Sequence, residues 1–172
     1  MTPDLIKNEK KIISLARSKG DISKPDICSP QGVGCGWATA TKLVKRLLKK
    51  DILVPSGTRE RASRYGKSAV TFSLHNGKHA ALGIDVEKGT TVIVHVLLNG
   101  DPVFETTIST PPLKDKAELT RFLNKCIPIG LHQAKQNNIE ICGIGVGIPF
   151  PGILIKKKED VYSILSKSLE QK

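Results

Sequence analysis

The pattern of apolar residues changes near residue 78, where longer β-rich runs begin, and this change limits the folds open to the chain. Before that point, apolar residues recur at helical spacing over 5–18 and 37–50, as on the buried face of an amphipathic helix. Beyond it they form longer runs that are typical of strands. A chain of 172 residues that is 39% apolar can fill two small cores. We therefore predict an α+β or α/β protein with domains at 1–78 and 79–172.

The first domain is expected to contain three helices. The helix over 5–18 is followed by Gly20, which suits a helix C-cap. A short second helix begins after Ser23, a good N-cap residue, and a proline and three glycines between residues 30 and 36 end it. The third helix covers 37–50. Its predicted inner face consists of Ala40, Leu43, Val44, Leu47 and Leu48.

Two short β-type runs follow the third helix, at 51–54 and 69–74, on either side of a polar segment rich in arginine. Two helices joined by a tight turn that contains glycine have the form of a helix-turn-helix, whose second helix enters the major groove of DNA. A hairpin beside such a helix pair is a wing. The pattern predicts a winged helix-turn-helix.

Positive charge is concentrated in this first domain. Residues 1–78 contain 16 Lys and Arg against 6 Asp and Glu, whereas residues 79–172 contain 11 against 10. The electrostatic field of such a concentrated positive charge attracts a polyanion, so double-stranded DNA is the expected partner. The opening turn of the third helix should meet base edges, and the hairpin should meet phosphates or the minor groove. The candidate DNA-binding residues are Trp37, Thr39, Thr41, Lys42, Lys45 and Arg46 on the helix, and Arg59, Arg61, Arg64 and Lys67 in the hairpin.

Other interpretations of these residues stay open from the sequence. A basic helix face is usually only solvated, and Trp37 alone is more often a packing residue. The arginine-rich loop could be a disordered segment without a partner. The combination of helix pair and hairpin is what favours DNA.

Several classes of protein are disfavoured by composition. No apolar run approaches the roughly 18 residues of a membrane span, and the N-terminus is charged rather than signal-like, so we expect a cytoplasmic protein without membrane contact. The four cysteines form no CxxC pair and have no histidine at zinc-ligand spacing. We therefore expect no metal, disulfide or cofactor. They are Cys28, Cys35, Cys126 and Cys142.

The second domain is expected to open with an antiparallel meander. Strands are predicted over 81–86, 91–98 and 103–109, with a hairpin turn at 99–101. An amphipathic helix over 116–137, interrupted near Pro128, precedes an apolar strand over 139–148 that suits parallel pairing. The order βββαβ is that of one lobe of a ribonuclease-H-like, actin-like ATPase.

Four motifs in this order are similar to the opening lobe of the ROK family, which comprises sugar kinases and sugar-responsive repressors. They are Gly-Ile-Asp-Val-Glu-Lys-Gly at 83–89, Asn-Gly at 99–100, Ser-Thr-Pro at 109–111 and the glycine-rich run at 143–152. The repressors alone carry a DNA-binding extension before the Gly-Ile-Asp strand. The resemblance therefore implies a regulator of sugar-metabolism genes, of the xylose-repressor type.

Departures from the family argue against catalysis. The kinases have a glycine pair where this chain has Glu87 and Lys88, and these side chains obstruct the approach of phosphates to the backbone. Asp85, which matches the kinases' phosphate-site aspartate, is then expected to be structural. The family's Asn-Asp motif, zinc-binding cluster and second lobe do not occur in these residues. We expect no enzyme, although a sugar-kinase fragment that needs a second lobe, or a protein-interaction module, remains the alternative.

The resemblance also implies a ligand site and a partner. Gly147, Pro149 and Gly152 match the loop that lines the family's sugar pocket, so a sugar effector could contact them, although a glycine-rich strand end is also typical of a tight turn. Residues 160–169 have amphipathic helical spacing. That helix could pack on the lobe or bind a second chain, and a homodimer on a two-fold operator is expected.

Overall fold

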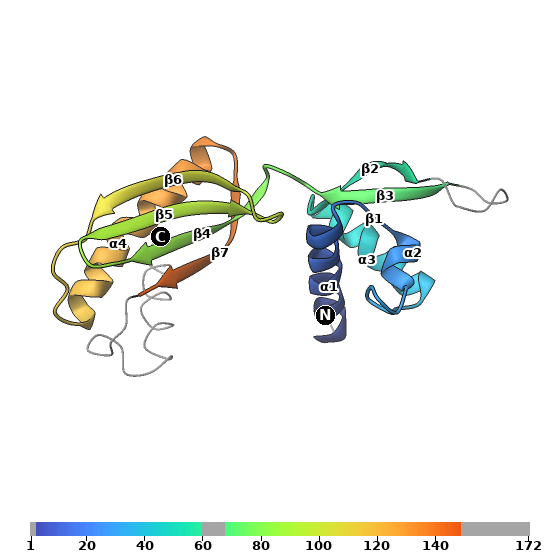
Figure 1. Cartoon of the computed structure of the whole chain (residues 1–172), viewed down its shortest axis with the longest axis horizontal. Helices are drawn as coiled ribbons and strands as arrows, with labels where there is room; N and C mark the ends of the chain where they lie inside the picture. The colour runs from blue at the N-terminus through green and yellow to red at the C-terminus, as the bar shows by residue number, and fades with distance from the viewer. Residues whose placement is uncertain (1–2, 60–67, 149–172) are drawn as a thin grey trace. The chain divides into compact units, whose positions relative to one another are not determined.

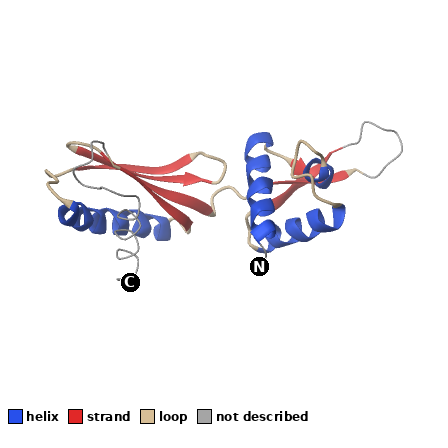
Figure 2. Ribbon diagram, turned by 90° about the horizontal axis from the view of Figure 1, so that it is seen from below, coloured by secondary structure: helices blue, strands red, loops and turns tan. Residues whose placement is uncertain are grey.

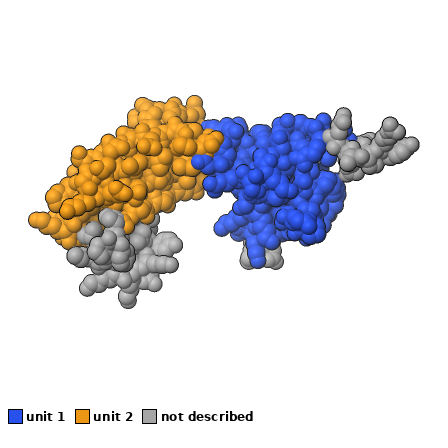
Figure 3. All heavy atoms as spheres, in the orientation of Figure 1, with its two compact units in different colours: residues 1–79, 98–100 blue, residues 80–97, 101–172 orange. Residues whose placement is uncertain are grey.

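The structure, a computed structural model, describes residues 3–59 and 68–148 of the chain. The chain divides into two compact units, coloured separately in Figure 3. The first comprises Met1–His79 with Leu98–Gly100, and the second comprises Ala80–Leu97 with Asp101–Lys172. Each unit has its own hydrophobic core. The fold is of the mixed α and β type.

The first unit combines three helices with a small antiparallel sheet of strand order β1-β3-β2. In Figure 1 the helices gather on one side of this sheet. The elements are α1 (Pro3–Lys19), β1 (Ile22–Ser23), α2 (Lys24–Cys28), α3 (Trp37–Lys49), β2 (Leu53–Arg59) and β3 (Ala69–Leu74).

The start of α2 is fixed by a capping box. The Ser23 side chain accepts a hydrogen bond from the Asp26 backbone N–H at 3.5 Å, and the Asp26 carboxylate accepts one from the Ser23 backbone N–H at 2.7 Å. These bonds satisfy two donors that a helix N-terminus otherwise leaves free. The short β1, which the sequence analysis missed, pairs Ile22 with Phe72 and Ser23 with Thr71 of β3.

The turn between α2 and α3 folds back on α2. The Ile27 carbonyl accepts hydrogen bonds from the backbone N–H groups of Val33, at 2.9 Å, and Gly34, at 3.2 Å. A Cβ atom at Gly32 would lie 2.0 Å from the backbone oxygen of Asp26. Only glycine fits at this position, and this close approach sets where α3 begins relative to α2.

The second unit is a four-stranded sheet with one helix on one of its faces (Figure 2). The strand order is β6-β5-β4-β7, and β5 is antiparallel to both of its neighbours. Helix α4 connects β6 to β7, which is drawn in the same direction as β4 in Figure 1. The elements are β4 (His79–Val86), β5 (Thr90–Leu97), β6 (Pro102–Ser109), α4 (Lys116–Gln136) and β7 (Glu140–Gly147).

Helix α4 is continuous, so the predicted interruption at Pro128 was wrong. Proline removes one backbone hydrogen bond from a helix interior and disfavours the geometry there. Pro128 is on the exposed side, whereas the opposite side of α4 packs against the sheet. Burial of that face offsets the lost hydrogen bond. The buried residues of α4 are Leu119, Phe122, Leu123, Cys126, Ile127, Gly130 and Ala134.

A histidine lies in the core between this sheet and α4. His95 of β5 is fully buried, and its Nε2 lies 2.9 Å from the carbonyl oxygen of Gly130. Because a carbonyl only accepts, Nε2 carries the proton. The Nδ1 atom is buried without a hydrogen-bond partner among the described residues. Burial lowers the pKa of His95, although the bond to Gly130 opposes that shift.

We expect the second unit to lose stability as the pH falls below about 6.5, the ordinary pKa of an unfolded histidine. Below that pH the unfolded chain binds a proton that folded His95 resists, so the free energy of unfolding decreases toward the lowered pKa. His95→Gln keeps a donor for Gly130 but cannot titrate, and should reduce this pH dependence in urea denaturation. The control is His132→Gln, on the exposed surface of α4. An identical pH dependence in His95→Gln and the parent would contradict this assignment.

Candidate nucleic-acid interface

Helix α3 has two faces of opposite character. Ala40, Leu43, Val44 and Leu47 are buried on one side. Lys42, Lys45 and Lys49 are exposed, and their spacing of three and four residues places them together on the opposite side of the helix. We call these three residues the lysine stripe. The core fixes the orientation of α3, and this orientation presents three cations to solvent.

Trp37 is the first residue of α3. It is 55% exposed, which is unusual for a large apolar side chain. The ammonium of Lys24, the first residue of α2, lies 5.5 Å from the centroid of its ring. That distance is within the range of a cation–π interaction. Trp37 was predicted from the sequence, but Lys24 was not, because nothing in the sequence relates two residues on different helices.

The structure places Arg46 differently from the lysines. Its Nε lies 3.1 Å from Oε1 of Glu9 on α1, and Nζ of Lys50 lies 3.4 Å from Oε2 of the same carboxylate. The side chain of Glu9 is only 9% exposed. A buried carboxylate needs a cationic partner because desolvation penalises an unpaired charge. Arg46 therefore ties α3 to α1, although it was proposed as a DNA contact.

The two threonines proposed as DNA contacts are less exposed than the lysine stripe. Thr39 and Thr41 are half-buried. The hydroxyl oxygen of Thr41 is buried and has no hydrogen-bond partner among the described residues. A base edge could not reach that hydroxyl in this arrangement. Of the proposed residues of α3, Trp37, Lys42 and Lys45 are the exposed ones.

The hairpin of β2 and β3 carries the remaining candidates. Arg59, at the end of β2, lies 3.2 Å from the Asp26 carboxylate and 3.0 Å from the carbonyl oxygen of Asp21. Burial acts to raise the pKa of Asp26, but the bonds from Ser23 and the charge of Arg59 outweigh it and hold that pKa below its usual value. Arg59 thus anchors the hairpin to the start of α2. Arg61, Arg64 and Lys67 lie outside the described residues.

Helix α1 carries a second group of lysines, which sequence analysis did not single out. Lys7, Lys10 and Lys11 are exposed and line a shallow hollow with Gln31 and Gly32. Their helical spacing was visible in the sequence, but α1 was considered only for its apolar face. Positive charge in the first unit is therefore present on α1 as well as on α3.

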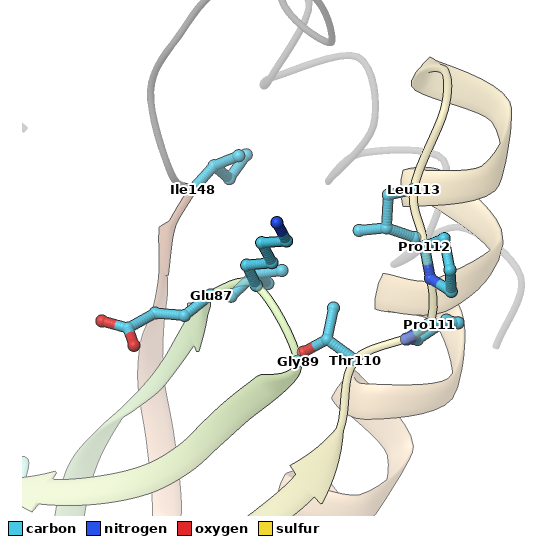
Figure 4. A pocket seen from close by; sticks show the side chains of 9 residues that line it. Glu87, Gly89, Thr110, Pro111, Pro112, Leu113 and Ile148 are labelled. Carbon is cyan, nitrogen blue, oxygen red and sulfur yellow. The ribbon is translucent and has the colours of Figure 1, made fainter.

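The second unit contains an apolar hollow of about 500 Å³ near the end of β7. Its described lining is the turn Glu87–Gly89 with Val86, the segment Thr110–Leu113, and Ile148. Figure 4 shows the Glu87 carboxylate pointing away from Leu113 and the hollow. The Thr110 hydroxyl is 2.6 Å from that of Thr91. The described part of this lining offers few polar groups to a ligand.

Of the three residues proposed as ligand contacts, Gly147 is described and Pro149 and Gly152 lie outside the described residues. Gly147 does not line the hollow, but its neighbour Ile148 does. A Cβ atom at Gly147 would lie 2.4 Å from Oδ1 of Asp85. The glycine therefore makes room for the Asp85 carboxylate at the end of the adjacent strand. This close approach accounts for a glycine here without any ligand.

Across residues 3–59 and 68–148, none of the helices combines the length and apolarity that crossing a lipid bilayer requires.

Comparison with known proteins gives two informative relatives. No protein-family profile matches the chain. A xylose repressor of Caldicellulosiruptor bescii is 30% identical over 126 residues, which cover 72% of this chain and 30% of that protein. The crystal structure of a ROK family transcriptional regulator, described as a homolog of the E. coli MLC protein, matches with a TM-score of 0.69 and 19% identity. That match covers 94% of this chain and 44% of the other.

Both relatives are much longer than this chain, which spans less than half the length of either. At 19% identity the solved regulator shows a common fold and nothing more. The xylose repressor adds a relationship in sequence over most of the chain. These two results agree with each other and with the motifs at 83–89 and 143–152. The chain is thus similar in sequence to a xylose repressor and in fold to a ROK family transcriptional regulator.

Proposed function

We propose that this chain is a DNA-binding transcriptional regulator of the ROK type that controls genes of sugar metabolism. In this proposal the first unit is a winged helix-turn-helix in which α2 and α3 form the helix pair and β2 and β3 form the wing. The second unit is a reduced ribonuclease-H-like lobe that assists assembly or effector sensing. The names of both relatives, a repressor and a transcriptional regulator, support this direction.

The observation that carries the proposal is the lysine stripe. A helix whose buried face consists of Ala40, Leu43, Val44 and Leu47 cannot rotate without exposing them, so its lysines have a fixed direction. Fixed cations on one helix face suit the phosphates that flank a major groove. Lys42, Lys45 and Lys49 would contact phosphates, and the first turn of α3 would approach base edges.

The remaining parts of the proposal follow from the family. A homodimer would bind a two-fold operator, as helix-turn-helix regulators do, in the cytoplasm. A sugar effector would act at the end of β7, near the hollow beside Ile148. We propose no catalytic role, because Glu87 and Lys88 occupy the turn between β4 and β5 where phosphates would have to approach the backbone.

The test is a titration of fluorescently labelled 30-base-pair duplex DNA with the chain, between about 50 and 200 mM salt. Each phosphate that a cation neutralises contributes about −0.9 to the slope of log K against log salt. Three lysines at phosphates predict a slope of about −3 or steeper. Fluorescence anisotropy measures the affinity at each salt concentration.

Single-stranded DNA of the same length is the control. Its weaker counterion release lowers the slope per phosphate to about −0.7, and a surface shaped for a groove should bind it more weakly than the duplex. Failure to bind duplex DNA at the lowest salt, or stronger binding to the single strand, would refute the proposed function.

A further inference from the structure

The exposure of Trp37 has no explanation within the described part of the first unit. More than half of its surface remains accessible, although its spacing of three and seven residues from Ala40 and Val44 aligns it with the buried side of α3. Apolar surface in water costs free energy in proportion to its area. A large ring in this position gains from a partner that covers it. Its neighbours limit the chemistry of that partner.

The contact recorded for the ring is with a cation. Lys24 lies over the ring at 5.5 Å, and Lys42, five residues further along α3, is a second exposed cation of the same unit. The partner must therefore be anionic overall and must still offer an apolar group to the ring. Duplex DNA meets both conditions, because thymine alone among the four bases carries a methyl group on its major-groove edge.

We propose that Trp37 determines specificity by packing against the 5-methyl group of a thymine, and that Lys24 positions its ring. The inference rests on the proposed function, because it requires α3 to lie in the major groove. It adds the base that is read and the residue that reads it. Lys24, on the neighbouring helix, restricts the ring through the cation–π contact, so that the exposed part of the ring faces the groove at low entropic cost.

The first experiment uses Trp37 as its own probe. It is the only tryptophan of the chain, so the tryptophan emission of the whole protein reports one site. Duplexes that bind best are first selected from a pool with a random 20-base-pair core. Addition of a selected duplex should give a saturable change in emission. The midpoint should agree with the affinity measured by anisotropy.

The second experiment replaces each thymine of the selected duplex in turn with deoxyuridine, which lacks only the methyl group. At one position we expect affinity to fall about fourfold, the value for burial of one methyl group. Trp37→Ala should bind the thymine and deoxyuridine duplexes equally at that position. The matched control is Val103→Ala, at a 42%-exposed apolar residue of the second unit, which should retain the fourfold preference.

Lys24 is tested by its effect on this preference rather than on affinity alone. Lys24→Gln removes the cation beside the ring and should reduce the preference for thymine. Lys24→Arg, whose guanidinium also stacks on aromatic rings, should restore it. A general loss of affinity in Lys24→Gln with an unchanged preference would remove the positioning role, because any lost cation weakens DNA binding.

The outcomes separate this inference from the proposed function. Absence of duplex binding by the parent chain would defeat both. Normal duplex binding with unchanged tryptophan emission, or with no deoxyuridine effect that depends on Trp37, would overturn the inference and leave the proposed function intact. A change in emission with protein concentration in the absence of DNA would also overturn it, since a second copy of the chain would then cover the ring. Circular dichroism confirms that each variant is folded.

Discussion

Replacement of both Lys42 and Lys45 by alanine is expected to weaken duplex-DNA binding about a hundredfold at about 50 mM salt. Each lost phosphate contact lowers the salt slope by about 0.9, which at that salt concentration corresponds to roughly tenfold in affinity. The slope of log K against log salt should therefore become shallower by about 1.8. Both side chains are exposed and oppose the buried face of α3, so the fold should be unaffected. Anisotropy titrations of the two proteins over the same salt range measure both quantities.

The chain offers a control with the same change in charge. Lys10→Ala with Lys11→Ala also removes two exposed cations from the first unit, but from α1. If α3 is the helix that contacts DNA, this variant should lose less than tenfold in affinity. Equal losses in the two double variants would show that only net charge matters, and would contradict the placement of the interface on α3.

Arg46→Ala extends the comparison to a cation that is already paired. It leaves the nearly buried carboxylate of Glu9 paired with Lys50, whose Nζ lies 3.4 Å away. The main effect should therefore be on the stability of the first unit. If Arg46→Ala instead lost as much DNA affinity as Lys42→Ala while its stability was unchanged, Arg46 would be a DNA contact, as the sequence predicted.

Gly32→Ala is expected to reduce the free energy of unfolding of the first unit by roughly 3 kcal/mol, at the upper end for overpacked sites. The new Cβ would lie 2.0 Å from the backbone oxygen of Asp26, and backbone cannot rotate away as a side-chain end can. The turn must open, and the bonds from Val33 and Gly34 to the Ile27 carbonyl are then strained or lost. Urea denaturation followed by circular dichroism and by Trp37 fluorescence measures the effect.

Gly36 provides the control in the same turn. It has nothing within 4 Å of an added Cβ and an ordinary backbone φ of −64°. Gly36→Ala should change stability by less than about 1 kcal/mol, since glycine is only a modest N-cap. Similar destabilisation by both substitutions would mean that the turn is sensitive to any side chain. The contact between Gly32 and Asp26 would then not be the cause.

Local sequence predicted most of the secondary structure. The strand Ala69–Leu74 has the predicted bounds, and α3 ends one residue earlier than expected. These elements depend on the spacing of apolar residues and on capping side chains, which act between neighbours in sequence. The errors arose where distant contacts decide. Burial of one face keeps α4 continuous through Pro128, and pairing with β3 makes a strand of Ile22 and Ser23.

The sequence by itself determined that the first domain is basic, that α3 has an apolar face, and that Lys42, Lys45 and Arg46 lie away from or beside that face. Only the tertiary structure decided which of these cations are free for a ligand. Arg46 is paired because Glu9, on another helix, is buried next to it, and Lys24 reaches Trp37 because the turn at Gly32 folds α2 against α3. The physical reason is that helical periodicity comes from contacts three and four residues apart. The ion pair of Arg46 and the contact of Lys24 with the Trp37 ring depend instead on packing between different helices, which helical periodicity does not predict.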